Sequence, residues 1–320
     1  MLSIILLFTK IVYVLGYILY EYIVKTFRLV YKRPPRHKCF QGQTVLITGA
    51  GGGLGRLMSI KFAQLGAYVI GWDVNHEGLL KTEQQVNINI EKSLHFISDS
   101  FFQFQCFDIS DRTLVYEHAR SIGKVDILVN NAGILSNNNF ILDKKDLEII
   151  KTFDVNALAH FWTVKAFLPR MMDEQNGHIV TISSVAGMIG TPRLSDYSAS
   201  KFATIGFHEA LDLELRAQGY ANKIHTTLVC PYVLNTGLFM GATKNSVDLF
   251  MPILEPEVAV DRIIIAVYNK QSKVVMPVFG SFVSALKLLM PWESWTKGIE
   301  LFGIHRVFAN ITRRNLTLVV

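Results

Sequence analysis

The stretch "TVLITGAGGGLGR" at residues 44–56 decides how the chain is expected to fold. Its first five residues are β-branched or apolar, as in a buried strand, and a helical pattern begins at its end. The glycines between them allow a tight turn, and the start of a helix presents unpaired N–H groups that bind phosphate. A strand, a glycine loop and a helix in this order predict a dinucleotide site at Gly49, Gly53, Leu54 and Gly55.

Strand and helix patterns alternate along the chain after this stretch. Short runs that are apolar on both faces predict buried parallel strands at 67–73, 104–108, 125–133, 177–184, 224–230 and 272–277. Helical segments separate these runs, so we expect an α/β fold, a Rossmann-type doubly wound parallel sheet of about seven strands. The stretch 93–103 breaks the alternation and is predicted to be a loop insertion of unknown function.

A carboxylate, Asp73, ends the second predicted strand about 20 residues after the glycine loop. At this position a carboxylate can accept both ribose hydroxyls of NAD, whereas it repels the 2′-phosphate of NADP. The next residues, Val74 and Asn75, offer no cation for that phosphate. Arg56 follows the glycine loop and keeps the NADP alternative open. The sequence therefore favours NAD as the cofactor.

The stretch "DYSASKF" at 196–202 places Tyr197 and Lys201 one helical turn apart, on the same face. A nearby cation favours the phenolate form of a tyrosine and lowers its pKa. The pair is therefore a candidate proton-transfer device. The alternative is an ordinary amphipathic helix, because tyrosine and lysine are common at this spacing.

The N-terminal segment from Met1 to Val24 is almost wholly apolar, interrupted only by Lys10 and Glu21. It is long enough to span a bilayer and lacks the features of a cleaved signal peptide. Beside such a segment, a basic cluster fits an anionic membrane surface better than nucleic acid, and it places the following domain in the cytoplasm. We expect an uncleaved anchor, spanning or interfacial, rather than a buried core helix. The cluster comprises Lys25, Arg28, Lys32, Arg33, Arg36 and Lys38.

The composition supports three parts of the chain. Mean hydropathy is +0.29, and the apolar excess lies at the two ends. We expect an anchor and basic linker at 1–38, an NAD-binding catalytic domain at 39–280, and an apolar or amphipathic helical extension at 281–320. The extension is core, a second membrane-contacting surface, or a mixture of the two. The three cysteines are far apart, so neither a disulfide framework nor a metal site is expected.

Together these motifs resemble the short-chain dehydrogenase/reductase family over roughly residues 40–280. The matching pieces include the glycine loop, "NNAG" at 130–133, Ser184 and Tyr-x-x-x-Lys, all in family order. The resemblance implies a catalytic tetrad of Asn156, Ser184, Tyr197 and Lys201. It also implies cofactor contacts from Asp108, Ile109, Asn130, Tyr197, Lys201 and Thr236. One departure is Tyr232, which stands after Pro231 where the family usually has glycine.

A narrower resemblance is to the membrane-associated branch with the retinol dehydrogenases and the lipid-droplet 17-beta-hydroxysteroid dehydrogenases. It rests on stretches such as "AHFWTVKAFLPRM" and "TTLVCPYVLNTG". The branch implies NAD-dependent oxidation of a lipophilic alcohol, foremost retinol to retinal. A steroid or other lipid-alcohol dehydrogenase at lipid droplets is the first alternative, and a non-catalytic coat protein of a membrane or lipid droplet is the second. The expected location is the endoplasmic reticulum membrane or the lipid droplet, and the long helical segments at 155–173 and 197–218 could pair in a homodimer.

Overall fold

The computed structural model describes residues 39–94, 101–235 and 252–301, and a few positions between 9 and 20. The chain divides into two compact units, Met1–Pro35 and Arg36–Val320. Most of the predicted anchor, and Thr236 with its predicted cofactor contact, lie outside the described residues. Within the part of the chain that is described, no helix has the length and apolar character needed to cross a membrane.

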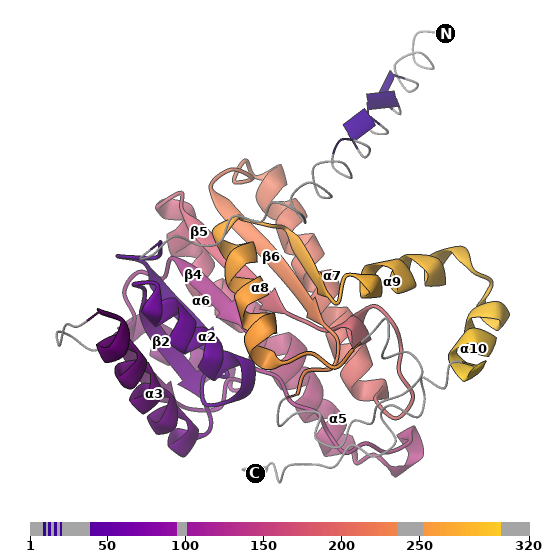
Figure 1. Cartoon of the computed structure of the whole chain (residues 1–320), viewed down its shortest axis with the longest axis horizontal. Helices are drawn as coiled ribbons and strands as arrows, with labels where there is room; N and C mark the ends of the chain where they lie inside the picture. The colour runs from indigo at the N-terminus through magenta and orange to yellow at the C-terminus, as the bar shows by residue number, and fades with distance from the viewer. Residues whose placement is uncertain are drawn as a thin grey trace. The chain divides into compact units, whose positions relative to one another are not determined.

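A seven-stranded sheet forms the centre of the second unit, in the order β3-β2-β1-β4-β5-β6-β7 (Figure 1). Every neighbouring pair is parallel, which confirms the predicted Rossmann-type sheet. The strands are β1 (Thr44–Thr48), β2 (Tyr68–Asp73), β3 (Phe102–Cys106), β4 (Ile127–Asn130), β5 (Gly177–Ile182), β6 (Ile224–Pro231) and β7 (Lys273–Met276).

Helices cover both faces of this sheet. The longer helices are α2 (Gly53–Gln64), α3 (His76–Leu94), α4 (Arg112–Ser121), α5 (Asp146–Phe153), α6 (Ala159–Asp173), α7 (Ser195–Ala217), α8 (Pro256–Tyr268), α9 (Phe279–Leu289) and α10 (Trp292–Leu301). Three single turns join them: η1 (Ile141–Asp143), the π-helical η2 (Asp154–Leu158) and η3 (Val185–Gly187). Buried side chains of α2, α3 and α8 share one apolar cluster, and those of α4, α6 and α7 share another.

The alternation of side chains along each strand explains these two layers. In β1, Val45 and Ile47 pack under α2 and α8, while Leu46 points to the opposite layer. Both directions are apolar because both faces are covered, as is usual for a parallel sheet. This is why the strands read as continuous apolar runs in the sequence.

The predicted loop insertion at 93–103 is wrong at both ends. Helix α3 continues to Leu94, and β3 begins at Phe102. Phe102 pairs with Val69 of β2 and is buried in the core, whereas the next residue, Gln103, is exposed. β3 is an edge strand, so its alternating polar residues lack the fully apolar pattern of the central strands. Residues 95–100 lie outside the described part of the chain.

The strand order places the topological switch point of the sheet at the carboxyl ends of β1 and β4. From β1 the chain adds β2 and β3 on one side of the sheet, and it then returns to add β4 on the other side of β1. In open parallel sheets, ligands bind at this switch point. The glycine loop follows β1 and the "NNAG" stretch follows β4, so both meet at the same edge.

We predict that Gly55→Ala destabilises the folded chain. A Cβ atom at Gly55 would lie 2.0 Å from the carbonyl oxygen of Gly49, so backbone would have to move. Overpacking of this kind typically costs about 1–3 kcal/mol of unfolding free energy. The measurement is the thermal unfolding midpoint of the purified protein. Gly206→Ala is the matched control, because Gly206 lies within α7 with nothing within 4 Å of its Cβ position. An equal midpoint for the two variants would contradict the prediction.

Candidate active site

The glycine loop is built so that its backbone can approach a ligand. Gly49 and Gly53 have φ of 71° and 51°, a region that favours glycine. A Cβ at Gly51 would lie 2.9 Å from the Asp73 carboxylate, while Cβ positions at Gly52 and Gly53 meet nothing within 4 Å. The loop is therefore tightly packed toward the sheet and open on its other side. This cradle fits the pyrophosphate of a dinucleotide.

Two polar side chains that the sequence reasoning missed join the glycine loop to β4. Thr48 Oγ1 accepts hydrogen bonds from the backbone N–H groups of Asn131 and Ala132, at 2.9 and 3.0 Å. The Asn131 side chain donates to the Thr48 carbonyl at 2.8 Å. These contacts hold the carboxyl ends of β1 and β4 together across the switch point. The clue was present in the sequence, since Asn131 belongs to the "NNAG" motif.

The Asp73 carboxylate lies against the glycine loop, at the end of β2. Its Oδ2 accepts from the backbone N–H of Gly51 and its Oδ1 from that of Asn75, both at 2.8 Å. Burial raises the pKa of Asp73 above its usual value, although these hydrogen bonds and the nearby Arg56 oppose the rise. A carboxylate offers about four lone-pair sites. It can therefore still accept hydroxyl donors from a ligand.

The guanidinium of Arg56 is hydrogen-bonded to the same glycine loop and to α3. It donates to the carbonyl of Gly51, to the carbonyl of Gly78 at 3.1 Å and to Thr82 Oγ1 at 3.0 Å. These bonds link α2 to the start of α3. Arg56 is thus engaged in holding the loop, which weighs against the idea that it binds a 2′-phosphate.

The remaining predicted cofactor residues differ in how they are placed. Asp108 accepts from Lys151 Nζ and from Ser110; burial raises the pKa of Asp108, but these partners outweigh it and lower the pKa. The side chain of Leu54 is buried in an apolar cluster, and that of Ile109 is partly buried against another. Their predicted cofactor contacts stay predictions.

Asn130 ends β4 with its side chain directed into the interior. Its Oδ1 accepts from Thr163 Oγ1 of α6 at 2.7 Å. Its Nδ2 is buried and has no hydrogen-bond partner among the described residues. A buried donor without a partner costs free energy, so the site is suited to an additional polar group. The predicted role of Asn130 at the cofactor is not tested by this placement.

Ser184, Tyr197 and Lys201 meet where β5 ends and α7 begins. The side chains of Ser184 and Tyr197 are hydrogen-bonded to each other. Lys201 Nζ lies 5.8 Å from the centroid of the Tyr197 ring and donates to the Ile182 carbonyl at 3.1 Å. Gly187 lets these segments approach closely, because its Cβ position lies 2.6 Å from the Lys201 carbonyl oxygen.

Burial dominates the proton affinities of this group. It raises the pKa of Tyr197 to about 12, against the lowering effect of the Ser184 hydrogen bond. It lowers the pKa of Lys201 to about 8. The net pKa of Tyr197 is therefore raised, because burial disfavours the phenolate. The predicted lowering of this pKa by Lys201 stays a prediction.

Asn156 lies in the π-helical turn η2, where its groups leave the regular helix pattern. Its Oδ1 accepts from the Ile134 N–H at 2.8 Å, and its Nδ2 donates to the Ile134 carbonyl at 2.9 Å and to Ser200 Oγ at 3.1 Å. A Cβ at Gly133 would lie 3.4 Å from both Asn156 Oδ1 and Lys201 Nζ. The four predicted tetrad residues are thus brought into one buried region.

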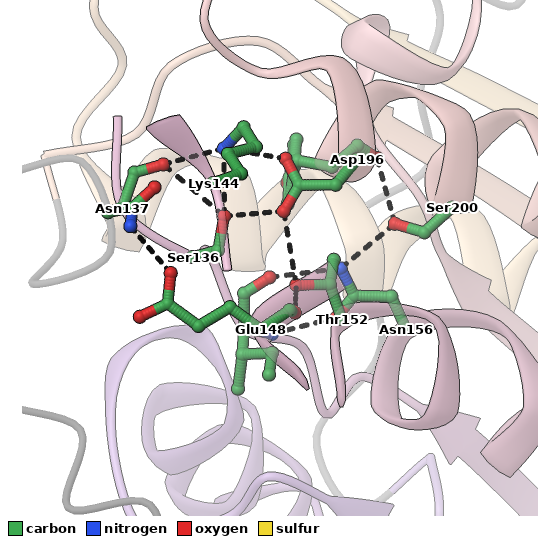
Figure 2. A network of polar contacts seen from close by, with 10 residues as sticks. Ser136, Asn137, Lys144, Glu148, Thr152, Asn156, Asp196 and Ser200 are labelled. Carbon is green, nitrogen blue, oxygen red and sulfur yellow. Dashed lines mark hydrogen bonds and ion pairs between the residues drawn. The ribbon is translucent and has the colours of Figure 1, made fainter. Parts of the chain in front are cut away.

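The surroundings of Tyr197 are apolar on one side. Leu135, Leu194 and Val233 form a buried cluster with Tyr197, and Tyr232 packs against it. Tyr232 is the residue that departs from the family pattern, and its ring adds to this apolar wall. A polar network surrounds a fully buried ion pair, Lys144–Asp196, next to Tyr197 in the chain (Figure 2). Sequence reasoning missed this pair, because nothing in the spacing links the two residues.

The chain matches known proteins over most of its length. Residues 43–265 match the family described as short chain dehydrogenase. Short-chain dehydrogenase/reductase family 16C member 6 of Bos taurus is 39% identical, with 88% of this chain and 87% of that protein covered. Epidermal retinol dehydrogenase 2 of Mus musculus is 42% identical, with 85% of each covered. Retinol dehydrogenase 10 of Xenopus tropicalis is 36% identical, with 81% of this chain and 82% of that protein covered.

Solved structures agree with this assignment. A metagenomic short-chain oxidoreductase in complex with NADP is 25% identical, with a TM-score of 0.60, and covers 74% of this chain and 96% of its own. A short chain dehydrogenase/reductase from Burkholderia phymatum in complex with NAD has the same fold, with a TM-score of 0.67 at 23% identity, covering 87% of this chain and 99% of its own. The chain therefore belongs to the short-chain dehydrogenase family and is an NAD(P)-dependent alcohol dehydrogenase.

Proposed function

We propose that the protein oxidises a lipophilic alcohol with NAD, foremost retinol to retinal. The observation that carries the proposal is the meeting of Ser184, Tyr197 and Lys201 beside an apolar wall, at the sheet edge that holds the glycine loop. The relatives named retinol dehydrogenases support the choice of substrate. An apolar wall beside the reacting oxygen favours an alcohol with a large hydrocarbon part.

Each polar group of the site has a role in this reaction. A bound nicotinamide dinucleotide supplies the hydride acceptor, held by the glycine loop and Asp73. Tyr197 Oη takes the hydroxyl proton as the carbon–hydrogen bond of the alcohol breaks. Ser184 Oγ donates a hydrogen bond to the same oxygen, where negative charge develops. Tyr197 must reach its phenolate form for this step, which the raised pKa opposes and a second cationic group in the site would favour.

Lys201 and Asn156 complete the proton path in this proposal. Lys201 has a pKa of about 8, so it can exchange a proton near neutral pH. Asn156 lies within reach of Gly133 and Lys201, as the Cβ position of Gly133 shows, and would hold a water molecule that receives the proton. The arrangement suits transfer from Tyr197 toward solvent without exposing the substrate.

A 17-beta-hydroxysteroid or other lipid alcohol at a lipid droplet is the alternative substrate class, since the apolar wall suits a rigid steroid as well. A non-catalytic coat protein is less well supported, because it has no need for three buried polar side chains, Asn156, Ser184 and Lys201, around Tyr197. Turnover with a panel of retinols, steroids and fatty alcohols distinguishes a retinol dehydrogenase from these two alternatives.

We propose that the protein works at a membrane of the endoplasmic reticulum or at a lipid droplet, with its catalytic domain in the cytoplasm. The support is the apolar segment at 1–24, its basic flank, and an exposed apolar face on α9. Phe282, Leu286 and Leu289 follow one side of that helix and are 59%, 37% and 83% exposed. Apolar residues also remain exposed on α6 and α7, among them Phe161, Phe202 and Leu213, which supports pairing of two chains as a homodimer through these helices.

The Tyr197→Phe variant should lose turnover but keep cofactor binding. The substitution removes the proton acceptor and preserves the ring, so we expect a fall of about 10² or more in kcat. NADH fluorescence with retinol in detergent micelles measures both turnover and binding. Tyr68→Phe is the control, because Tyr68 is the first residue of β2 and lies at the amino end of the strand, away from the carboxyl ends that carry the site. Near-native turnover of the Tyr197 variant would remove it from the role of acid/base.

The Asp73→Ser variant should change the choice of cofactor. Two charge-assisted hydrogen bonds to the ribose favour NAD, and the like charge of a 2′-phosphate disfavours NADP. We expect the native protein to prefer NAD by about tenfold or more in kcat/KM, and the variant to lose this preference. Initial rates with each cofactor measure the ratio. Asp261→Ser, at a half-exposed surface ion pair, should leave the ratio unchanged. A native preference for NADP would contradict the assignment of Asp73.

Deletion of residues 1–38 should release at least part of the protein from membranes. The deleted part contains the apolar segment and all of its basic flank. Fractionation of carbonate-washed membranes measures the release. In the deleted chain, Phe282→Ser/Leu289→Ser should lower the residual binding further, whereas Leu80→Ser on α3 should not. Unchanged membrane binding of the deleted chain would show that the anchor is not at 1–38.

A further inference from the structure

We infer that the buried ion pair between Lys144 and Asp196 is a positioning device that locks the segment 134–137 against the helix that carries Tyr197. Neither residue touches the reacting atoms in this inference. It rests on the proposed function, because it concerns the same site. The device acts through Tyr197 and through the apolar wall that faces it.

The ammonium of Lys144 contacts three oxygen atoms although it is shielded from solvent. Lys144 Nζ lies 2.9 Å from Asp196 Oδ1, and the side chains of both residues are 0% exposed. The same ammonium donates to Ser136 Oγ at 2.9 Å and to the carbonyl of Asn137 at 2.7 Å. The ion pair and the two hydrogen bonds together offset part of the loss of water around a buried cation. This set of contacts holds the ammonium in one place. It also fixes the position of every group that the ammonium touches.

The carboxylate connects this cation to the start of α7. Asp196 Oδ2 accepts from Ser136 Oγ and, at 3.4 Å, from Thr152 Oγ1 of α5. Asp196 directly precedes Tyr197 in the first turn of α7, where a negative charge also interacts favourably with the helix dipole. Thr152 lies one turn before Asn156. The pair therefore joins the two chain segments that carry Tyr197 and Asn156 (Figure 2).

The segment 134–137 is held from both ends. At Ile134 its backbone N–H and carbonyl pair with the Asn156 amide. At Ser136 and Asn137 it is bonded to Lys144. Leu135 lies between these attachments and packs in the same buried cluster as Tyr197. Releasing the Lys144 end frees the apolar wall opposite the Tyr197 hydroxyl, even if the tetrad remains folded.

A positioning role also explains why charges are used here. A buried ion pair adds little net stability compared with apolar residues of the same size, but it demands one geometry. Glu148 extends the network outward, since its Oε2 accepts from Asn137 Nδ2 at 2.5 Å. The consequence is that removal of both charges should preserve the fold better than removal of one, while still loosening the site.

The test compares Lys144→Met with the double variant Lys144→Met/Asp196→Asn in the full chain. Turnover is measured with NAD and all-trans-retinol, once with ordinary retinol and once with retinol deuterated at the alcohol carbon. The rates are divided by the concentration of sites that bind NADH. We expect the single variant to unfold at a lower temperature, because Asp196 keeps a buried charge without its partner. Both variants should lose about tenfold or more in kcat, while KM for NAD stays within about twofold. The primary isotope effect should rise, because misplacement of Tyr197 slows the chemical step.

Two further variants, Lys81→Met and Ser136→Ala, complete the test. Lys81→Met applies the same substitution to an exposed pair with Glu77 and should behave as the native protein. Ser136→Ala keeps both charges but removes their shared hydroxyl, and should lower kcat in the same direction if the charge variants do not fold. Native kcat and isotope effect in the double variant, or in Ser136→Ala when the others do not fold, would overturn the inference. Absence of alcohol oxidation by the native protein would instead overturn the proposed function.

Discussion

The close approach of the glycine loop to the first turn of α2 is the constraint on which the rest of the site depends. Because the Cβ position of Gly55 lies 2.0 Å from the Gly49 carbonyl oxygen, only glycine allows this packing. The packing in turn lets Asn131 and Thr48 tie the ends of β1 and β4 together. The junction of β1 and β4 therefore sets the positions of the open side of the loop, the acid at the end of β2 and the tetrad.

Desolvation is the second force that shapes the site. The hydroxyl of Tyr197 and the ammonium of Lys201 are both buried, and burial moves their pKa values toward the neutral forms, to about 12 and about 8. At neutral pH the phenol of Tyr197 is therefore neutral, whereas Lys201, with a pKa of about 8, is still mostly cationic. A further cation that enters the site would favour the phenolate form of Tyr197.

The polar network around Asp196 shows how a fold can keep charges in an apolar interior. Lys144 Nζ lies 2.9 Å from both Asp196 Oδ1 and Ser136 Oγ, and Ser136 also donates to Asp196 Oδ2, all shielded from water. The network lies next to the cluster of Leu135 and Tyr197, so an apolar wall and a charged clamp share one backbone segment. This combination suits a site that must admit a lipophilic molecule and still control a proton.

The sequence by itself determined the parallel α/β sheet, the glycine loop, the acid at the end of β2 and the order of the tetrad, because these features are written as local periodicity and fixed spacings. It misplaced β3, since an edge strand with alternating polar residues resembles a loop. Only the tertiary structure decided that Arg56 is hydrogen-bonded to the glycine loop, that burial raises the pKa of Tyr197, and that Lys144 meets Asp196. Those outcomes depend on contacts between residues far apart in the chain and on exclusion of water, and neither leaves a periodic trace in the sequence.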